Sequence, residues 1–569
     1  MTRRKIVLVV ASVLAIGALA SSGLAATSAQ QDVAITVLAE DVPAGLDWDG
    51  PAIGIDTSQT GMINLSDFLV GYAPAGQNSE GVKLLNFKKF VPRLATSWTY
   101  DAKTLVWTFK LRQGVVGCND TTFNADDVIY TFQRAKSVSG PAAVAWFLSG
   151  IASIKGFDNS VFDADKTKAA AARVLKSDEV WKVDDFTIKI KQVAPNALFL
   201  AMLTIFPLGI LDKETMMAQA TKADPWSHQY QNNTNLPSFG PYCLQKWVKD
   251  SSFDVVANPK YYRGKAAIDR VVYRKVPQSS NRVAAIQTGS AQLVEHLTPQ
   301  EFDSLKTKAT KTVTVAGVVG NQNLFLLMNW KSQPFQNKTL RQAVAYAIPY
   351  AQVIKIGYFG AAHQWLGQIP STYPFYVKPK TQFSYDQAKA KALLAKAGFP
   401  GGKGLEKFAS SFQLTYPAER ESTLGPLATV IRSALQAVGI PAELNPIPNT
   451  QFGDRLFVKK DLPFALQDAE KPIGVDADYA ALINVVPGGP ANYANYDNPV
   501  VTKLALAAKV EANTAKRQAQ LTQLQNIVQN DVNWVPIAEY KTQWAFSPKL
   551  TGLTWHPTNT VEWYDLKLG

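Results

Sequence analysis

A stretch in the first quarter of the chain decides the fold; it reads TLVWTFKLRQGV at residues 104–115 and FNADDV at residues 123–128. In the first part, apolar side chains occupy every second position, which predicts a half-buried strand. In the second part, Asn124 followed by Asp127 has the spacing of a helix N-cap with an acid in the first turn. A strand that leads through a short loop into a helix is the building unit of an α/β fold. The alternating apolar residues are Leu105, Trp107, Phe109 and Leu111.

The same signals recur along the rest of the chain. Residues 186–190 repeat the two-residue apolar period and predict a second half-buried strand. Residues 427–438 carry apolar side chains at helical spacing, and Gly439 supplies a left-handed stop. Residues 441–444 then return as a strand, as in a βαβ unit. Strands and helices that alternate in this way predict a mixed α/β protein.

Two further helices are marked by their capping residues. Ser384 and Gln387 have the spacing of a capping box, and the helix that they begin would end at Gly398. Asn498 followed by Pro499 indicates a second start, with an N-cap residue and proline in the first helical position.

The N-terminus has the features of a secretory leader. Arg3, Arg4 and Lys5 precede a largely apolar run over residues 6–20, and small residues follow. The apolar run is too short to cross a bilayer comfortably, so we expect a signal peptide over residues 1–29 rather than an anchor helix. Its cleavage site falls between Ala25 and Ala29 and is left open. No cysteine lies there, so we expect a periplasmic protein without a lipid anchor.

Composition narrows the classes of partner. The chain has 58 Lys and Arg against 45 Asp and Glu, a formal charge of +13, and the basic residues are spread among acids without a dense run. We therefore expect no nucleic-acid binding. Exposed aromatic groups are costly, so the 13 tryptophans are expected in cores and in a ligand cleft. Cys118 and Cys243 allow one disulfide in an oxidising compartment, or stay as two buried thiols.

Common catalytic and metal-binding motifs are missing from the sequence. It contains no Gly-x-Ser-x-Gly elbow and no His-Glu-x-x-His, and its 4 histidines are far apart. The glycine-rich residues 398–404 lack the spacing and the hydroxyl of a phosphate loop. We expect no enzyme, no cofactor and no metal site. The alternative left open is an extracytoplasmic hydrolase, a glycosidase or peptidase, on the same scaffold, because a sequence does not show how far apart two acids lie.

Blocks of sequence spread over nearly the whole chain resemble one family. In their order they are similar to the solute-binding proteins of peptide, nickel and opine ABC importers, the extended dipeptide- and oligopeptide-binding family known as family 5. The matching blocks are PRLATSW at 92–98, WTFKLRQGV at 107–115, FNADDV at 123–128, GPY at 240–242, NPKYYRGK at 258–265, LRQAVAYAI at 340–348 and NYDNP at 495–499.

The resemblance implies an architecture. It is the periplasmic-binding-protein-like α/β fold, with two lobes, mixed sheets, hinge crossovers near residues 324–326 and 537–538, and an extra third domain. Lobe I would comprise residues 30–70, 200–318 and 541–569. The extra domain would span residues 71–199, and lobe II residues 319–540. A ligand between the lobes would shift an equilibrium between open and closed forms.

The resemblance also implies a function and candidate ligand-binding residues. We expect a peptide-like or opine-like solute, captured between the lobes and delivered to an inner-membrane ABC permease by a monomeric receptor. Relatives hold a ligand amine with an aspartate, for which Asp476 or Asp478 is the counterpart, and a ligand carboxylate with an arginine, for which Arg420 is an offset candidate. The predicted cleft residues are Glu40, Asp47, Trp365, Tyr373, Arg420 and Asp476.

Overall fold

The protein is described by a computed structural model, in which residues 32–48, 56–137, 144, 147–157, 174–307, 312–468 and 472–569 are described. Contacts within the chain separate Met1–Asp32 from a second unit, Val33–Gly569. The predicted signal peptide, residues 1–29, lies outside the described residues. Everything below concerns the second unit.

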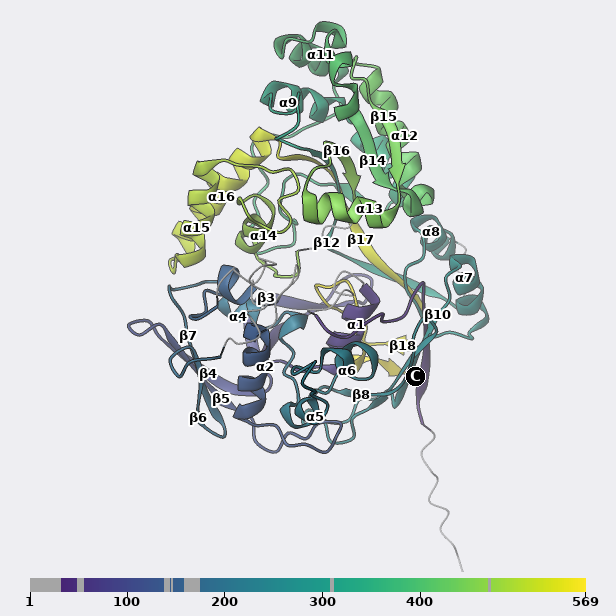
Figure 1. Ribbon diagram of the computed structural model, residues 1–569. Coiled ribbons are helices and arrows are strands. Elements are labelled where there is room, and N and C mark those ends of the chain that lie inside the picture. Colours follow the sequence, from purple (N-terminus) through teal and green to yellow (C-terminus); the bar gives the residue numbers. More distant parts are fainter. Residues whose placement is uncertain are drawn as a thin grey trace, which may run out of the picture. The chain divides into compact units, whose positions relative to one another are not determined.

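An 11-stranded mixed sheet forms the centre of this unit (Figure 1). Ten of its strands follow the order β15-β14-β16-β12-β17-β11-β1-β10-β9-β8, and β13 pairs with β17 beside that path. In chain order, the strands are β1 (Ala34–Ala39), β8 (Tyr242–Val248), β9 (Ser252–Ala257), β10 (Arg270–Lys275), β11 (Leu293–Val294), β12 (Thr314–Met328), β13 (Ala362–Gln364), β14 (Gln413–Pro417), β15 (Glu443–Ile447), β16 (Phe464–Gln467) and β17 (Trp534–Phe546).

Two groups of parallel strands lie in this sheet, with two long antiparallel strands between them. The strands β10 and β11 both run parallel to β1, and β15 and β16 both run parallel to β14. The long strands β12 and β17 pair with each other and join the two groups. Their register shifts between Val319 and Gln322, which is the signature of a β-bulge.

Short-range signals in the sequence position the βαβ units. Helix α12 (Glu421–Gln436) connects β14 to its parallel neighbour β15, as predicted, and Gly439 beyond it has φ +97°. A left-handed residue after a helix favours glycine because no Cβ clashes there. In the other parallel group, α7 (Ser279–Thr288) connects β10 to β11. Each group therefore contains a crossover helix between two strands that run in the same direction.

The smaller sheets lie outside this frame. One has the order β4-β5-β7-β6, and α2 (Ala125–Ser137) contacts its strands β6 and β7. Another has the order β2-β3-β19-β20, and β18 pairs with β21. These strands are β2 (Val70–Gln77), β3 (Lys83–Pro92), β4 (Ala95–Asp101), β5 (Val106–Leu111), β6 (Val180–Asp184), β7 (Thr187–Lys191), β18 (Leu550–Thr551), β19 (Thr554–Trp555), β20 (Val561–Glu562) and β21 (Lys567–Leu568).

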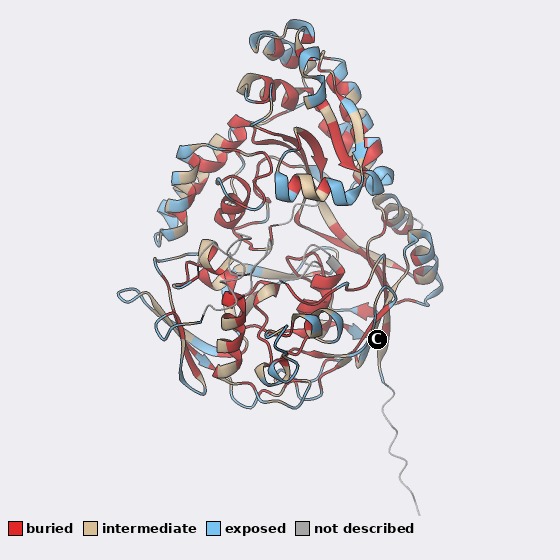
Figure 2. Cartoon of the chain, viewed as in Figure 1, coloured by how far each residue is buried: buried red, intermediate tan, exposed pale blue. Residues whose placement is uncertain are grey.

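Helices cover the strands, and buried residues concentrate where the two meet (Figure 2). One hydrophobic cluster, whose buried members lie between Leu324 and Ala538, packs β14 and β16 against α9, α10, α11 and α12. The remaining α-helices are α1 (Asp56–Leu65), α4 (Phe199–Met202), α5 (Lys213–Ala218), α6 (His228–Asn233), α8 (Pro299–Thr307), α9 (Lys338–Ala347), α10 (Tyr350–Tyr358), α11 (Gln387–Lys396), α13 (Asn449–Gly453), α14 (Ala477–Asn484), α15 (Pro499–Val510) and α16 (Thr514–Asp531).

Two local predictions are corrected by the structure. Helix α11 is capped by Asp386, whose side chain accepts a hydrogen bond from Lys389 N, and not by Ser384. The carboxylate of Asp386 is closer to the first free backbone N–H groups, so it displaces the predicted serine. Leu105 has φ +59° and lies before β5, because the chain turns there before the strand begins.

Candidate functional site

A cavity of about 460 Å³ lies between the two parallel groups of the central sheet, beside the middle of β12 and β17. Its wall is formed by residues that follow the carboxyl ends of five strands. Glu40 follows β1, and Arg420 and Asp468 follow β14 and β16. Open α/β sheets bind ligands at the carboxyl ends of their parallel strands, and a cavity of this size is typical of small-molecule sites. From the other strand ends come Pro277, Ser279 and Arg282 after β10, and His296, Leu297, Thr298 and Pro299 after β11.

The register of the sheet explains why these strand ends converge. Val294, at the end of β11, pairs with Ala545 of β17, so β11 points toward the middle of β17. Gln467, at the end of β16, pairs with Phe325 of β12 and points toward the same middle segment from the opposite side. That segment contributes Gln322, Tyr540, Lys541, Thr542 and Gln543 to the cavity, beside the bulge in β12.

Arg420 and Asp468 form an ion pair in the wall of the cavity. Arg420 Nη2 lies 2.5 Å from Asp468 Oδ2, and the side chain of Arg420 is 45% exposed. Asp468 raises the pKa of Arg420 above its usual range, so the guanidinium stays charged. The Tyr540 hydroxyl donates to the backbone oxygen of Asp468 at 2.5 Å, and the Tyr540 ring stacks on Tyr358. An aromatic wall beside opposite charges suits a ligand with both an anionic and a cationic end.

Arg282, on the β10 side of the cavity, binds backbone oxygens of the protein itself. Its Nη1 donates to the backbone oxygens of Val276 and Pro277, and its Nη2 donates to that of His296, all within 2.9 Å. Burial lowers the pKa of Arg282. The hydrogen bonds of the guanidinium therefore link the loop that follows β10 to the loop that follows β11.

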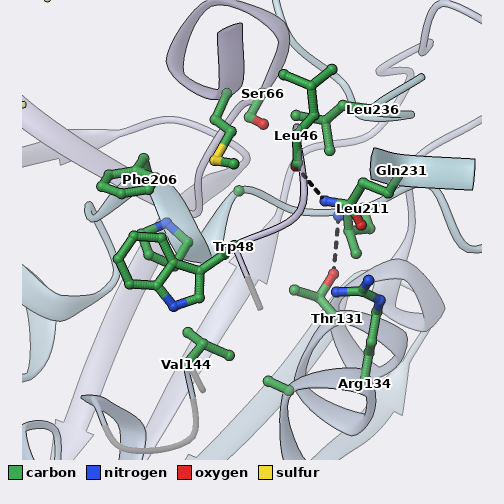
Figure 3. Close-up of a pocket in the computed structure, with 14 residues that line it drawn as sticks. Leu46, Trp48, Ser66, Thr131, Arg134, Val144, Phe206, Leu211, Gln231 and Leu236 are labelled. Atoms are coloured by element: carbon green, nitrogen blue, oxygen red, sulfur yellow. Dashed lines mark hydrogen bonds between the residues drawn. The ribbon is translucent and has the colours of Figure 1, made fainter. Parts of the chain in front are cut away.

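Asp47 lies elsewhere, beside a second and much smaller cavity. That cavity holds about 30 Å³ among Leu46, Trp48, Phe206 and their neighbours, which is room for roughly one water molecule (Figure 3). Two hydrogen bonds cross its wall: Gln231 Nε2 donates to Leu46 O at 2.8 Å, and Leu211 N donates to Thr131 Oγ1 at 3.0 Å. The dimensions exclude a peptide or an opine from this cavity.

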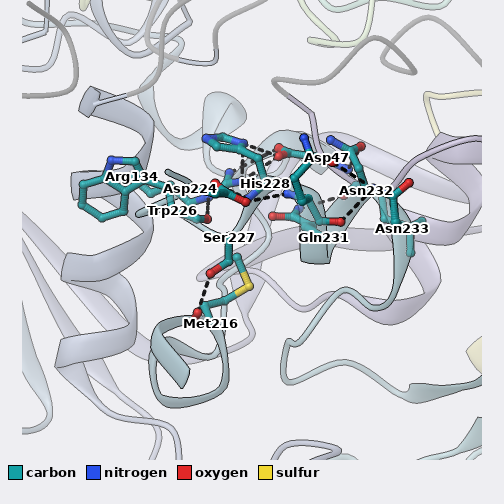
Figure 4. Close-up of polar contacts among 12 residues, drawn as sticks. Asp47, Arg134, Met216, Asp224, Trp226, Ser227, His228, Gln231, Asn232 and Asn233 are labelled. Carbon is teal, nitrogen blue, oxygen red and sulfur yellow. Dashed lines mark hydrogen bonds and ion pairs between the residues drawn. The ribbon is translucent and has the colours of Figure 1, made fainter. Parts of the chain in front are cut away.

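The carboxylate of Asp47 is held by Arg134 and His228. Arg134 Nη2 lies 2.7 Å from Asp47 Oδ2, and His228 Nδ1 contacts the same oxygen (Figure 4). Burial alone would raise the pKa of Asp47, but the charge of Arg134 and the contact with His228 outweigh it and hold that pKa well below its usual value. The fully buried carboxylate is thus satisfied within the protein.

Three other predicted cleft residues also make internal contacts and do not line the 460 Å³ cavity. Trp365 is 1% exposed and donates from Nε1 to Ile369 O at 3.0 Å. The hydroxyl of Tyr373 accepts from Asn321 Nδ2 at 3.1 Å. Asp476 caps α14 and forms a two-pronged ion pair with Arg517, at 2.7 and 2.9 Å. The structure thus brings Glu40 and Arg420 together at one cavity and places the other four predicted residues away from it.

Asp468 was missed as a candidate. It opens the segment in which Asp476 and Asp478 stand, and it directly follows the buried strand β16. An acid immediately after a short apolar strand is the signal that could have identified it, because strand ends are where α/β sheets place their ligands. Within the described ranges, no three His, Cys, Asp or Glu side chains are grouped to hold a metal ion.

Comparisons with known proteins place the chain in a family. The family model described as bacterial extracellular solute-binding proteins, family 5, matches residues 89–480. The chain belongs to this family. It is 27% identical to heme-binding protein A of Haemophilus influenzae over 508 residues, which cover 85% of this chain and 86% of the relative. It is 29% identical to the dipeptide-binding protein of Escherichia coli K12 over 390 residues, covering 67% and 68%.

Solved structures of solute-binding proteins share the fold. A dipeptide-binding protein from Pseudoalteromonas sp. SM9913 in complex with Met-Leu has a TM-score of 0.75 at 20% identity and covers 94% of this chain and 100% of that one. MoaA from A. tumefaciens R10 in complex with mannopinic acid has a TM-score of 0.73 at 21% identity, covering 94% and 99%. The predicted periplasmic-binding-protein-like α/β fold is thereby confirmed, and these comparisons give no support to the hydrolase alternative. No helix in the described part of this family 5 protein is long and apolar enough to span a membrane.

Proposed function

We propose that this family 5 solute-binding protein captures a zwitterionic peptide-like or opine-like solute in the 460 Å³ cavity and delivers it to an ABC permease in the inner membrane. The observation that carries the proposal is the Arg420–Asp468 pair at the converging strand ends. A ligand carboxylate would bind Arg420 and a ligand ammonium would bind Asp468, so the ligand would replace one ion pair by two. Charged hydrogen bonds of this kind are roughly twice as strong as neutral ones.

The proposal includes a closing motion of two lobes. Lobe I is assigned to residues 30–70, 200–318 and 541–569, the extra domain to 71–199, and lobe II to 319–540. Support comes from the sheet, in which β1, β10 and β11 belong to the first lobe, β14, β15 and β16 belong to the second, and β12 and β17 connect them. The bulge between Val319 and Gln322 lies at the edge of the cavity, where a hinge has to bend.

The cellular setting is part of the proposal. A signal peptide over residues 1–29 would be cleaved on export, and the mature receptor would act in the periplasm as a monomer without a lipid anchor. Export also agrees with the disulfide that the structure places between Cys118 and Cys243, because disulfides persist in oxidising compartments.

The test is calorimetric titration of the mature protein with Ala-Ala, a small zwitterion. We expect Arg420→Ala and Asp468→Asn each to weaken binding at least tenfold, because each leaves one end of the ligand without its charged partner. The control is Arg455→Ala, which removes an arginine paired with Asp461 outside the cavity and should leave affinity unchanged. Equal losses in all three variants would contradict the assignment, and mass spectrometry that found a cleaved dipeptide would contradict a pure receptor.

A further inference from the structure

We infer that the ligand carries a second cationic group, an ammonium or guanidinium, which lies against Glu40. This deepens the proposed function and rests on it. Glu40 is the first residue after β1, its side chain is exposed, and it lines the cavity. Within the residues that the structure describes, no lysine, arginine or histidine nitrogen lies within 4 Å of its carboxylate, whereas Asp468 on the other wall has Arg420.

The groups beside Glu40 also present hydrogen-bond acceptors. Ser279 Oγ donates to Glu301 Oε1 at 2.6 Å, and Thr298 Oγ1 donates to Glu301 Oε2 at 2.9 Å. Each hydroxyl has a single proton, so both protons are used and only oxygen lone pairs remain for a ligand. Glu301 itself is kept away from the ligand by the two hydroxyls that it binds.

The guanidinium of Arg282, which lies on this wall, does not compete for the ligand. Arg282 is 1% exposed, and its two terminal nitrogens donate to three backbone oxygens. Its charge acts on Glu40 through space, as that of Arg420 does from the other side, but it forms no ion pair with Glu40. Glu40, Ser279 and Thr298 therefore offer a carboxylate and hydroxyl lone pairs, and the group that suits them is rich in N–H.

Charge balance leads to the same class of ligand. The termini of a zwitterion are matched by Arg420 and Asp468, which leaves the carboxylate of Glu40 without a counter-charge in contact. A closed cavity excludes water and strengthens this imbalance, because charges interact more strongly at low dielectric. A peptide with a lysine or arginine side chain, or a basic peptide-like solute, supplies the missing charge.

The experiment compares four dipeptides by calorimetric titration: Ala-Ala, Ala-Lys, Lys-Ala and Ala-Glu. We expect at least one lysine dipeptide to bind ten times more tightly than Ala-Ala, and Ala-Glu to bind more weakly. Acetylation of the lysine side chain should remove the gain. Glu40→Gln should lower the affinity of the lysine dipeptides to that of Ala-Ala measured with the same variant.

The matched control is Glu419→Gln. Glu419 lines the same cavity from the β14 side, where it accepts from Asn449 N at 2.8 Å. The control variant should keep the preference for lysine, and a loss there with none in Glu40→Gln would overturn the assignment. Equal affinity for Ala-Ala and both lysine dipeptides would overturn the inference while the proposed function stood, provided that Arg420→Ala still weakened Ala-Ala. If none of the four dipeptides binds, the peptide-like part of the proposed function is overturned, and this inference with it.

Discussion

At the scale of single residues, the carboxylates fall into two groups. Some are paired with an arginine inside the protein, and others line the cavity, where a ligand can bind them. Asp47 and Asp476 are buried and each is bound by an arginine. Glu40 and the Arg420–Asp468 pair face a cavity. Since a buried charge without a partner costs several kcal/mol, the internal pairs hold the fold, and the groups at the cavity remain available for recognition.

Asp478 is less well paired than Asp47 and Asp476, which makes it a sensitive site for a pH measurement. It is fully buried, Arg517 Nη2 lies 3.4 Å from its Oδ2, and its Oδ1 has no hydrogen-bond partner among the described residues. Arg517 is already engaged by Asp476. Burial raises the pKa of Asp478 to about 7 against the opposing charge of Arg517, so the folded protein holds a proton there below neutral pH.

We predict that Asp478→Asn changes the pH dependence of stability. Between the ordinary carboxyl pKa of about 4 and about 7, the unfolded chain has lost the proton and the folded chain keeps it, so stability falls as pH rises. The wild-type protein should lose about 2 kcal/mol relative to the variant between pH 5 and pH 7, as measured by denaturant unfolding. The control is Asp250→Asn, at a carboxylate that is 86% exposed. Parallel curves for wild type and Asp478→Asn would show that Asp478 is ionised throughout.

Part of the site could be predicted from the sequence, and the reason is local. Glu40 directly follows β1 and Arg420 lies three residues after β14, where the family resemblance places a ligand-binding arginine after a strand. Trp365 and Tyr373 were chosen as aromatic residues in a loop, and loops also supply core residues; both are buried. Asp476 is a candidate because the family resemblance makes it the counterpart of an aspartate that holds a ligand amine. The partner that occupies it, Arg517, is 41 residues away in α16, and no local pattern indicates that contact.

At the scale of elements, capping residues predict where single helices begin. Helix α15 begins as expected, with the Asn498 side chain accepting from Val500 N and Val501 N. Before α2, Asn124 Oδ1 accepts from Asp126 N, and Asp127 Oδ2 accepts from Asn124 N. Local sequence patterns do not indicate which distant elements pair with each other. The disulfide between Cys118, in the loop after β5, and Cys243, in β8, is one such link.

Removal of this disulfide should destabilise the protein measurably. The two cysteines are 125 residues apart, so the link restricts a long loop of the unfolded chain, and we expect the Cys118→Ser, Cys243→Ser variant to be about 2–5 kcal/mol less stable. Thermal melting with and without dithiothreitol is the measurement. Reductant should lower the Tm of the wild type and leave that of the double variant unchanged. A wild-type Tm that does not respond to complete reduction would contradict a stabilising role.

At the scale of the whole described unit, function follows from sheet topology. The two parallel groups are predictable as βαβ units, but their order around β12 and β17 is not, because it depends on register between strands hundreds of residues apart. β11 pairs with β17 over Leu293↔Phe546, and β12 pairs with β17 through the bulge. Only this arrangement brings the ends of β1, β10, β11, β14 and β16 to one cavity.

The same topology predicts that ligand closes the molecule. If β12 and β17 are the hinge, a ligand held by Arg420 and Asp468 on one wall and Glu40 on the other favours the form in which both walls touch it, since only a difference in affinity shifts such an equilibrium. Small-angle X-ray scattering of the mature protein should show a smaller radius of gyration with saturating Ala-Lys. A concentration of 100 times the Kd should also stabilise the fold by about 2.7 kcal/mol.

Arg420→Ala separates closure from nonspecific compaction. At the same Ala-Lys concentration the variant should keep the larger radius of gyration, because it lacks the group that binds the ligand carboxylate. A second variant, Gly320→Ala, probes the hinge itself, since a Cβ at this position would lie 2.4 Å from the Trp555 ring. It should alter the radius without ligand while Arg420 and Asp468 stay intact. A radius that does not change although calorimetry shows Ala-Lys bound would mean that this receptor binds without closing, and the bulge in β12 would then serve the shape of the cavity rather than its motion.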